Sequence, residues 1–561
     1  MNGAWILPIA VLLPLALAVL WLVPPLRPLL ARLAPWSALP ALSLSLFAGG
    51  LEVQLPWLLL GSWWLLDDLA RAFLGMTALL WLLAGLYARY YPPVQRSGDN
   101  FWPFWLLTLA GNLTLIVSRD VASFYAAFAL MTFAGYGLVV HAGTEPARRA
   151  GRIYLIMAVI GEMLILAGLL LAANSAESMS LPALPGAIAN SPHGNGISLL
   201  LLLGFGVKAG LPLLHMWLPL AHPVAPTPAS AVLSGAMIKA GLLAWLLLLP
   251  LGMTSLPAGQ WLMVAGLVAA FSAALIGVSQ RAGKAVLAYS SVSQMGLITV
   301  MVGLGLWQAK LWPLLLPAVV LYVIHHGLAK GALFLAAGAL PRSGKGYWLV
   351  LTLPALALAG LPLTSGAVAK LAMKEAVYQG TVWPALPWLL SLAAVATTLL
   401  VSRFIWLNYQ QDGEDNPPVR RLWLVSVAAS LTGIWWLPHL GDPALAPGLT
   451  GKQLPDLLWP IFAGIGLAAL AWRYRPGFRE IPRGDLIVVL EALTGRLLGH
   501  LGRMADLIGR ARDRCSALAA NLHRQLHRAG TRLLLEEDHW RVEGALAFGL
   551  LVMVLGLLWV I

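Results

Sequence analysis

The residues best able to do chemistry in this chain are ionisable side chains that interrupt long apolar runs. Lysines outnumber carboxylates among them, and a lysine removed from water gives up its proton more readily than one at the surface. Such a row favours proton relay over metal binding, which would need carboxylates or several histidines at ligand spacing. The candidates are Glu162, Lys208, Lys239, His325, His326, Lys330, Lys370, Lys374 and Glu375.

The position of each charge along its apolar run indicates whether the side chain reaches the membrane surface or stays inside the membrane. A lysine near the end of a span can extend its ammonium to the membrane surface. We expect this of Lys374 and Glu375, whereas Lys208 and Lys370 lie more centrally. An ionisable group that stays inside a membrane is costly and is therefore a functional candidate.

Two of the lysines lie beside a helix-breaking motif that occurs twice. Residues 208–212 read Lys-Ala-Gly-Leu-Pro, and residues 359–362 read Ala-Gly-Leu-Pro, with Lys370 about two turns later. Proline inside a helix removes a hydrogen bond, so we expect breaks at Pro212 and Pro362. Broken spans at corresponding places in two halves indicate a transport site. A short apolar string can recur by chance, but a lysine beside both copies favours a repeat.

The elements that must position these groups are membrane helices. The chain has 561 residues, of which 60% are hydrophobic and 11% charged, against about 25% charged in a soluble domain. One span needs about 20 apolar residues, and the chain supplies such runs repeatedly. We predict about sixteen spans, at approximately 3–24, 36–52, 68–91, 101–118, 120–142, 150–173, 196–220, 224–250, 258–279, 284–307, 311–340, 347–378, 383–408, 420–438, 455–473 and 543–561.

The basic residues predict how these spans are oriented. Arginine and lysine concentrate in alternate loops, such as those with Arg148 and Arg149 or with Arg281 and Lys284. By the positive-inside rule these loops are cytoplasmic and both termini lie outside. The run from Ala4 to Val23 has no basic start and no cleavage site, so we interpret it as a retained first helix. Nucleic-acid binding is disfavoured despite the net charge of +13, because the charges follow this loop pattern.

One long segment is amphipathic and does not span. Between residues 487 and 529, apolar residues recur in steps of three and four, and arginines occupy the other face. This periodicity predicts a helix about 65 Å long. It rests on anionic lipid or braces neighbouring subunits, and the sequence leaves both interpretations open.

Four ordered stretches resemble one known family. Residues 206–241 (GVKAGLPLLHMWLPLAHPVAPTPASAVLSGAMIKAG), 284–296 (KAVLAYSSVSQMG), 326–338 (HGLAKGALFLAAG) and 358–370 (LAGLPLTSGAVAK) resemble the antiporter-like proton-conducting membrane subunits. That family serves complex I, hydrogenase-4 and formate hydrogenlyase, and Mrp Na⁺/H⁺ antiporters. The string WLPLAHPVAP, with Leu220 where many members carry Asp, is most similar to the hydrogenase-linked group.

The resemblance implies an all-α polytopic fold with two inverted five-helix repeats, at 101–250 and 258–408. Helices at 1–100 would precede them, and further helices at 420–473, the lateral helix at 485–530 and a last span at 543–561 would follow. By position, Lys208 would be the central lysine of the first half and Lys239 its relay. His326 and Lys330 would bridge the halves, and Lys370 would be the terminal proton donor.

One departure concerns the partner of Lys208. Family members usually carry a glutamate on the fifth helix, where this chain has Ala129. Without a carboxylate nearby, Lys208 is harder to keep protonated. We hypothesise that Glu162, on the sixth helix, substitutes for it. Ser293 and Gln294 could hold water in the channel, and helix packing is an equally good interpretation.

The leading hypothesis is a proton-translocating subunit of a redox-driven complex. Cys515 is the sole cysteine and no dinucleotide fingerprint is present, so we expect no cofactor, no metal and no active site in this chain. Expected partners are other membrane subunits, a peripheral cytoplasmic module, lipid and protons, with sodium as an alternative ion, in a bacterial inner membrane. Alternatives are an Mrp-type antiporter subunit, the proton-coupled half of an inorganic carbon uptake complex, and a scaffold with an inactive channel.

Overall fold

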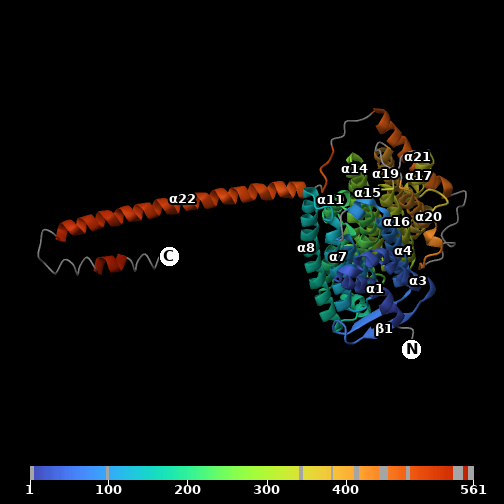
Figure 1. Ribbon diagram of the computed structural model, residues 1–561, viewed down its shortest axis with the longest axis horizontal. Helices are drawn as coiled ribbons and strands as arrows, with labels where there is room; N and C mark the ends of the chain where they lie inside the picture. The colour runs from blue at the N-terminus through green and yellow to red at the C-terminus, as the bar shows by residue number, and fades with distance from the viewer. Residues whose placement is uncertain are drawn as a thin grey trace. The chain divides into compact units, whose positions relative to one another are not determined.

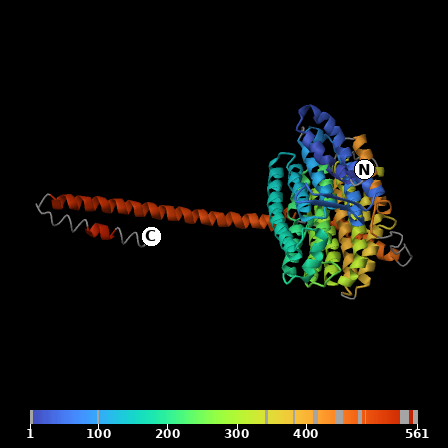
Figure 2. The same cartoon turned by 90° about the horizontal axis from the view of Figure 1, so that it is seen from below.

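The computed structural model describes residues 5–96, 100–339, 345–380, 383–409, 416–440, 453–474, 480–484, 486–534 and 548–553. The chain divides into two units, Met1–Leu486 and Ile487–Ile561. The first unit is a bundle whose long helices run side by side (Figures 1 and 2). The predicted extra span at 543–561 lies mostly outside the described residues.

The first unit contains helices α1 to α21. They are α1 (Ile6–Leu20), α2 (Arg27–Leu33), α3 (Leu39–Phe47), α4 (Asp68–Tyr90), α5 (Pro92–Arg96), α6 (Phe101–Val117), α7 (Val121–Val139), α8 (Glu145–Ala176), α9 (Leu184–Asn190), α10 (Gly194–Ala209), α11 (Trp217–Val224), α12 (Thr227–Val232), α13 (Ile238–Leu248), α14 (Ala258–Ser279), α15 (Gly283–Trp307), α16 (Trp312–Ala336), α17 (Lys345–Ala359), α18 (Ser365–Tyr378), α19 (Leu386–Tyr409), α20 (Pro417–Thr432) and α21 (Gln453–Tyr474).

The predicted membrane fold is confirmed. Within the described ranges, ten helical segments are long and apolar enough to cross a membrane, and four shorter apolar helices accompany them. Helices α15 and α16 form the centre: every residue from 285 to 306 and from 318 to 336 is buried. The total of sixteen spans and the two inverted repeats stay predictions.

The second predicted span, at 36–52, is misplaced. The helical segment runs from Pro24 to Phe47, and a β-hairpin of β1 (Leu51–Leu55) and β2 (Ser62–Leu66) follows it. Gly50 has a φ of +67°, a conformation that favours glycine, and it turns the chain out of the helix. The alternating burial of β1 and β2 is the period of strands.

Arg119, in the short connection between α6 and α7, is buried at the hairpin. Its side chain is 2% exposed, and Nη2 donates to Asp67 Oδ2 at 2.7 Å. Asp120 accepts a hydrogen bond from the backbone N–H of Trp63 at 2.8 Å. The hairpin therefore covers the Arg119 side chain at the end of α6, while Asp67 stays 39% exposed.

The two predicted helix breaks share one backbone conformation. Helices α10 and α11 are interrupted around Pro212, and α17 and α18 around Pro362. Gly210 and Gly360 have φ of +85° and +99°, and Leu213 and Leu363 have φ of +69° and +63°. A positive φ is uncommon for leucine. Because it occurs at matching places of two Ala-Gly-Leu-Pro-Leu strings, the two helix breaks have the same backbone structure.

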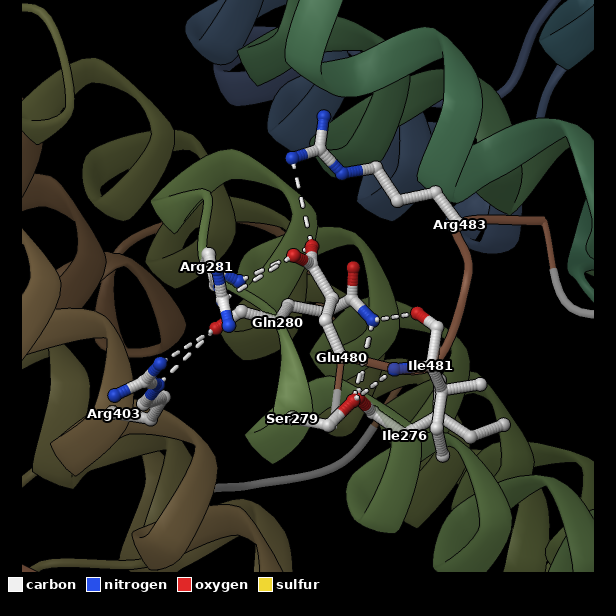
Figure 3. Close-up of polar contacts among 8 residues, drawn as sticks. All are labelled: Ile276, Ser279, Gln280, Arg281, Arg403, Glu480, Ile481 and Arg483. Carbon is white, nitrogen blue, oxygen red and sulfur yellow. Dashed lines mark hydrogen bonds and ion pairs between the residues drawn. The ribbon is translucent and has the colours of Figure 1, made fainter. Parts of the chain in front are cut away.

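Residues 480–484 bind to the junction between α14 and α15 (Figure 3). Gln280 Nε2 donates to the carbonyl of Ile481 at 2.9 Å, and the N–H of Ile481 donates to Ser279 Oγ at 3.2 Å. Arg403, on α19, donates twice to the carbonyl of Gln280. We call these contacts the 480–484 anchor; it fixes the chain just before the long helix of the second unit begins.

The predicted amphipathic helix is α22 (Leu486–Leu534). At 1.5 Å per residue its 49 residues extend about 74 Å. Its apolar side chains are exposed within its own unit, among them Leu493, Leu497, Leu501, Met504 and Ile508. This unit thus presents a continuous apolar stripe.

Candidate proton path

Lys208 lies in a pocket between α7, α8, α10 and α11. The pocket has a volume of about 280 Å³ and is lined by Phe128, Thr132, Tyr154, Ala158, Gly161, Glu162, Ile165, Gly204, Val207, Lys208 and Trp217. The lysine is 5% exposed and Glu162 is 4% exposed. The break after α10 leaves Lys208 near the end of its helix, where the chain bends away and makes room for the ammonium.

Three aromatic rings surround the Lys208 ammonium. Nζ is 5.2 Å from the ring centre of Tyr154, 5.5 Å from that of Trp217 and 6.0 Å from that of Phe128. Ammonium groups within about 6 Å of ring faces are attracted by the ring quadrupoles. Nζ also donates to Tyr154 Oη at 3.2 Å, and that hydroxyl donates to the carbonyl of Thr132 at 2.7 Å. We call these residues the aromatic cage.

Glu162 faces the same pocket, beside the Thr132 hydroxyl. Both of its carboxylate oxygens are buried without a hydrogen-bond partner among the described residues, and no ion pair within 4 Å joins it to Lys208. The two charges nevertheless influence each other electrostatically. Ala129, at the usual glutamate position, does not line the pocket. Glu162, the hypothesised substitute, thus lines the same pocket as Lys208.

Lys239 and Lys330 are linked through two adjacent serines of α15. Lys239 Nζ donates to the carbonyl of Ser234, at 2.6 Å, in the π-helical turn Leu233–Met237. The hydroxyls of Ser234 and Ser291 are 2.7 Å apart, and Lys330 Nζ donates to Ser290 Oγ. Such π-turns often occur at functional sites. This one turns a backbone carbonyl toward a buried ammonium.

The two histidines of α16 have different surroundings. His325 Nδ1 is 2.8 Å from Ser365 Oγ, on α18. His326 is fully buried, and neither ring nitrogen has a hydrogen-bond partner among the described residues. Lys239 and Lys330 both act on His326 electrostatically. His326 therefore lies within electrostatic reach of both Lys239 and Lys330, the lysine with which the resemblance pairs it as the bridge between the halves.

Lys370 reaches back across the second helix break. Its Nζ donates to the carbonyl of Ala359 at 3.0 Å, and a Cβ on Gly360 would lie 3.0 Å from Lys370 Cδ. A larger residue at 360 would thus displace the lysine. Lys370 opens into a second pocket, of about 290 Å³, together with Lys374, Ser391 and Asp456.

Several expectations need correction or completion. Lys374 does not extend to the surface: it is 7% exposed and lies 3.9 Å from Asp456 Oδ2. Ser293 donates to the carbonyl of Ala270, which favours helix packing. Gln294 bonds both Thr397 and Tyr322 between helices.

The sequence reasoning missed other residues in or beside these pockets. In the pockets they are Phe128, Tyr154, Trp217 and Asp456, and outside them they are Ser290 and Ser291, near Lys330. Tyr154 precedes Glu162 by eight residues, a spacing that puts both on one helix face. That spacing could have revealed it, whereas the serines carry no such signal. In the described ranges, no cluster of three or more His, Cys, Asp or Glu side chains could hold a metal ion.

Comparisons with known proteins agree with this architecture. Hydrogenase-4 component B of Escherichia coli (strain K12) is 30% identical over 286 residues, 49% of this chain and 43% of that protein. Na⁺/H⁺ antiporter subunit A1 of Staphylococcus aureus (strain JH9) is 30% identical over 290 residues, 50% of this chain and 36% of that protein. The aligned regions span half or less of these relatives' lengths.

Two solved structures share the fold. A chain of the Mrp complex from Dietzia sp. DQ12-45-1b gives a TM-score of 0.71 at 22% identity, covering 89% of this chain and 60% of that one. A chain of the membrane-bound sulfane sulfur reductase, an archaeal respiratory membrane complex, gives a TM-score of 0.66 at 21% identity. The match covers 98% of this chain and 100% of that one.

The family match extends over the whole candidate path. The model described as "NADH:quinone oxidoreductase/Mrp antiporter, TM" matches residues 118–400, just over half of the 561 residues. It includes both helix breaks and every lysine described above, which confirms the resemblance first noted in the motifs. The chain belongs to the NADH:quinone oxidoreductase/Mrp antiporter transmembrane family.

Proposed function

We propose that this chain is a proton-translocating membrane subunit of a multi-subunit, redox-driven complex. The observation that carries the proposal is the series of four buried lysines on α10, α13, α16 and α18. Each ammonium donates to a hydroxyl or a backbone carbonyl of a neighbouring segment. Such groups can gain and lose protons in turn, with water carrying the proton between them.

The buried charges favour protons over sodium as the transported ion. Sodium is a hard cation that binds oxygen ligands, as other hard cations do. Along this path Glu162 and Asp456 supply one carboxylate to each pocket, and the other charged residues that line the pockets are lysines. Positive ammonium groups repel a metal cation but exchange protons.

The chain's relatives supply the redox part of the proposal. Hydrogenase-4 component B is by its name part of a hydrogenase, and the sulfane sulfur reductase is a respiratory complex. We propose that electron transfer takes place in partner subunits and a peripheral cytoplasmic module, and that charge changes there drive the lysines. A bacterial inner membrane with both termini outside completes the proposal.

Purification of the tagged chain in mild detergent, with mass spectrometry of co-purified proteins, tests the assembly. Iron–sulfur and hydrogenase or dehydrogenase subunits are the expected result. Recovery of only antiporter subunits, or of only a zinc-containing cytoplasmic partner, would overturn the redox assignment.

Proton movement is tested separately in liposomes. The purified complex is reconstituted with a pH-sensitive dye inside, and an imposed potassium diffusion potential drives protons inward. We expect flux well above that of protein-free liposomes, and loss of that flux in Lys208→Met and Lys370→Met. Flux equal to that of empty liposomes would refute proton translocation.

A further inference from the structure

We propose that Asp456, on α21, is the proton-release group of the second half of the path and receives its proton from Lys370. This inference rests on the proposed function and extends it to a residue outside the family match at 118–400. The Lys370 ammonium loses a proton to water in the shared pocket. The Asp456 carboxylate accepts that proton, becomes a carboxylic acid, and then releases it to the exterior.

The pocket provides a graded route from the interior to the surface. Lys370 is 5% exposed, the Lys374 side chain is 9% exposed and the Asp456 side chain is 50% exposed. All three line one pocket of about 290 Å³. The Lys370 ammonium is buried and donates to the Ala359 carbonyl. Of the three ionisable groups in this pocket, Asp456 is therefore the one from which a proton can pass to water outside.

The packing of α21 fixes Asp456 at this place. Leu457, the next residue, is buried against Ala367 and Leu371 of α18, the helix that carries Lys370. Asp456 also lies in the first turn of α21, where the helix dipole favours a carboxylate. The side chain is therefore held at the mouth of the pocket rather than free to swing away.

A merely structural salt bridge explains this arrangement less well. The Lys374–Asp456 distance of 3.9 Å is long for an ion pair, and the Asp456 side chain is half exposed to water that screens it. The stronger competing explanation is charge balance. Asp456 would then neutralise Lys374, whose positive charge also acts on Lys370. The other titratable groups near Asp456 are Tyr378 and, beyond it, Glu375.

The liposome flux assay separates these explanations with four variants. Asp456→Asn removes the proton acceptor, Asp456→Glu keeps a carboxylate, and Asp456→Asn with Lys374→Gln removes both charges. Glu375→Gln is the matched control, because Glu375 is exposed on the same helix as Lys374 and does not line the pocket. We expect at least tenfold loss in Asp456→Asn and in the double variant, and near-normal flux in Asp456→Glu and Glu375→Gln.

The outcomes distinguish the inference from the function on which it rests. Normal flux in Asp456→Asn, or restored flux in the double variant, would overturn the role of Asp456. Loss of flux in Lys370→Met would show, in the same experiment, that the proposed function still stands. Wild-type flux no higher than in empty liposomes would instead remove the proposed function itself.

A further variant keeps the test sharp if Asp456→Asn fails to insert. Asp456→His keeps an ionisable group at this position. The unperturbed pKa of a histidine side chain is about 2.6 units above that of an aspartate side chain. We expect the acid side of the flux-against-pH profile to move upward. An unmoved profile would show that the proton does not pass through position 456.

Discussion

Lys208 is held by ring faces and a tyrosine hydroxyl where family members usually offer a glutamate. The aromatic cage stabilises the ammonium without bringing a second charge close to it. Cation–π attraction at a desolvated site is worth about 2 kcal/mol. The cage can therefore supply part of what a close carboxylate would contribute, together with the electrostatic effect of Glu162 in the same pocket.

Removal of one cage ring should slow proton flux. In Trp217→Leu, the lost attraction of about 1–2 kcal/mol corresponds to about a 5- to 30-fold change in the population of charged Lys208. We expect a flux decrease of that order in liposomes. Trp261→Leu, the same change at an exposed tryptophan outside both pockets, is the control and should behave as wild type. Equal flux in both variants would contradict a role for the cage.

Glu162→Gln should abolish flux while leaving the protein stable. A buried carboxylate without hydrogen-bond partners destabilises the fold, so the neutral amide should leave the melting temperature unchanged or raise it. Glu177→Gln, at the exposed end of the same helix, is the matched control. Full flux in Glu162→Gln would show that Glu162 does not substitute for the missing glutamate.

At the level of elements, the two broken helices depend on glycine. Gly210 and Gly360 adopt left-handed φ, which costs other residues about 1–2 kcal/mol. Gly360→Ala would also press on Lys370. The same sequence string therefore produces the same break in both places. In the second break, Gly360 also leaves the space that the Lys370 side chain occupies.

Alanine at either break glycine should lower the melting temperature, and Gly360→Ala should also reduce flux. Gly196→Ala, in α10, is the control, because nothing lies within 4 Å of its added Cβ and alanine favours a helix. That control should melt at the wild-type temperature or above it. Melting of Gly360→Ala at the wild-type temperature would contradict the strain argument.

The 480–484 anchor is held by a few hydrogen bonds and ion pairs at the surface of the bundle. Its ion pairs are partly exposed and contribute little, so its hydrogen bonds matter more (Figure 3). Gln280→Ala removes the bond to the Ile481 carbonyl, worth about 1 kcal/mol. Hydrogen exchange at 480–484 should then be about fivefold faster, measured by mass spectrometry. Arg421→Ala, an exposed arginine of α20, should leave it unchanged; equal rates in both variants would show that the anchor is not held by Gln280.

At the scale of the whole molecule, the path and the long amphipathic helix belong to different units. The first unit has its own buried core around α15 and α16. The second unit exposes an apolar stripe along α22. Burial of that stripe against lipid or neighbouring subunits would stabilise an assembly rather than the bundle itself.

A chain truncated after Leu486 should therefore still insert and fold. We expect a single peak in size-exclusion chromatography and a melting temperature close to that of the full chain, with fewer partner subunits co-purified. An aggregated truncated chain would show that the bundle needs α22 for its own stability.

The sequence by itself determined the membrane class, the family, the two breaks and the lysines, because these depend on composition, local backbone chemistry and residue type. It also predicted α22 from periodicity alone. It misplaced the second span and missed the β-hairpin, since an apolar strand and an apolar helix look alike over few residues.

Only the tertiary structure decided which side chains share a pocket. Phe128, Tyr154 and Trp217 come from three helices, and Asp456 lies 82 positions after the Lys374 it faces. Contacts of this kind arise from the packing of helices that are distant in sequence, and no local pattern encodes them. The residue types therefore determine which groups can exchange protons, while the packing of the helix bundle determines which of these groups lie close enough together to form a path.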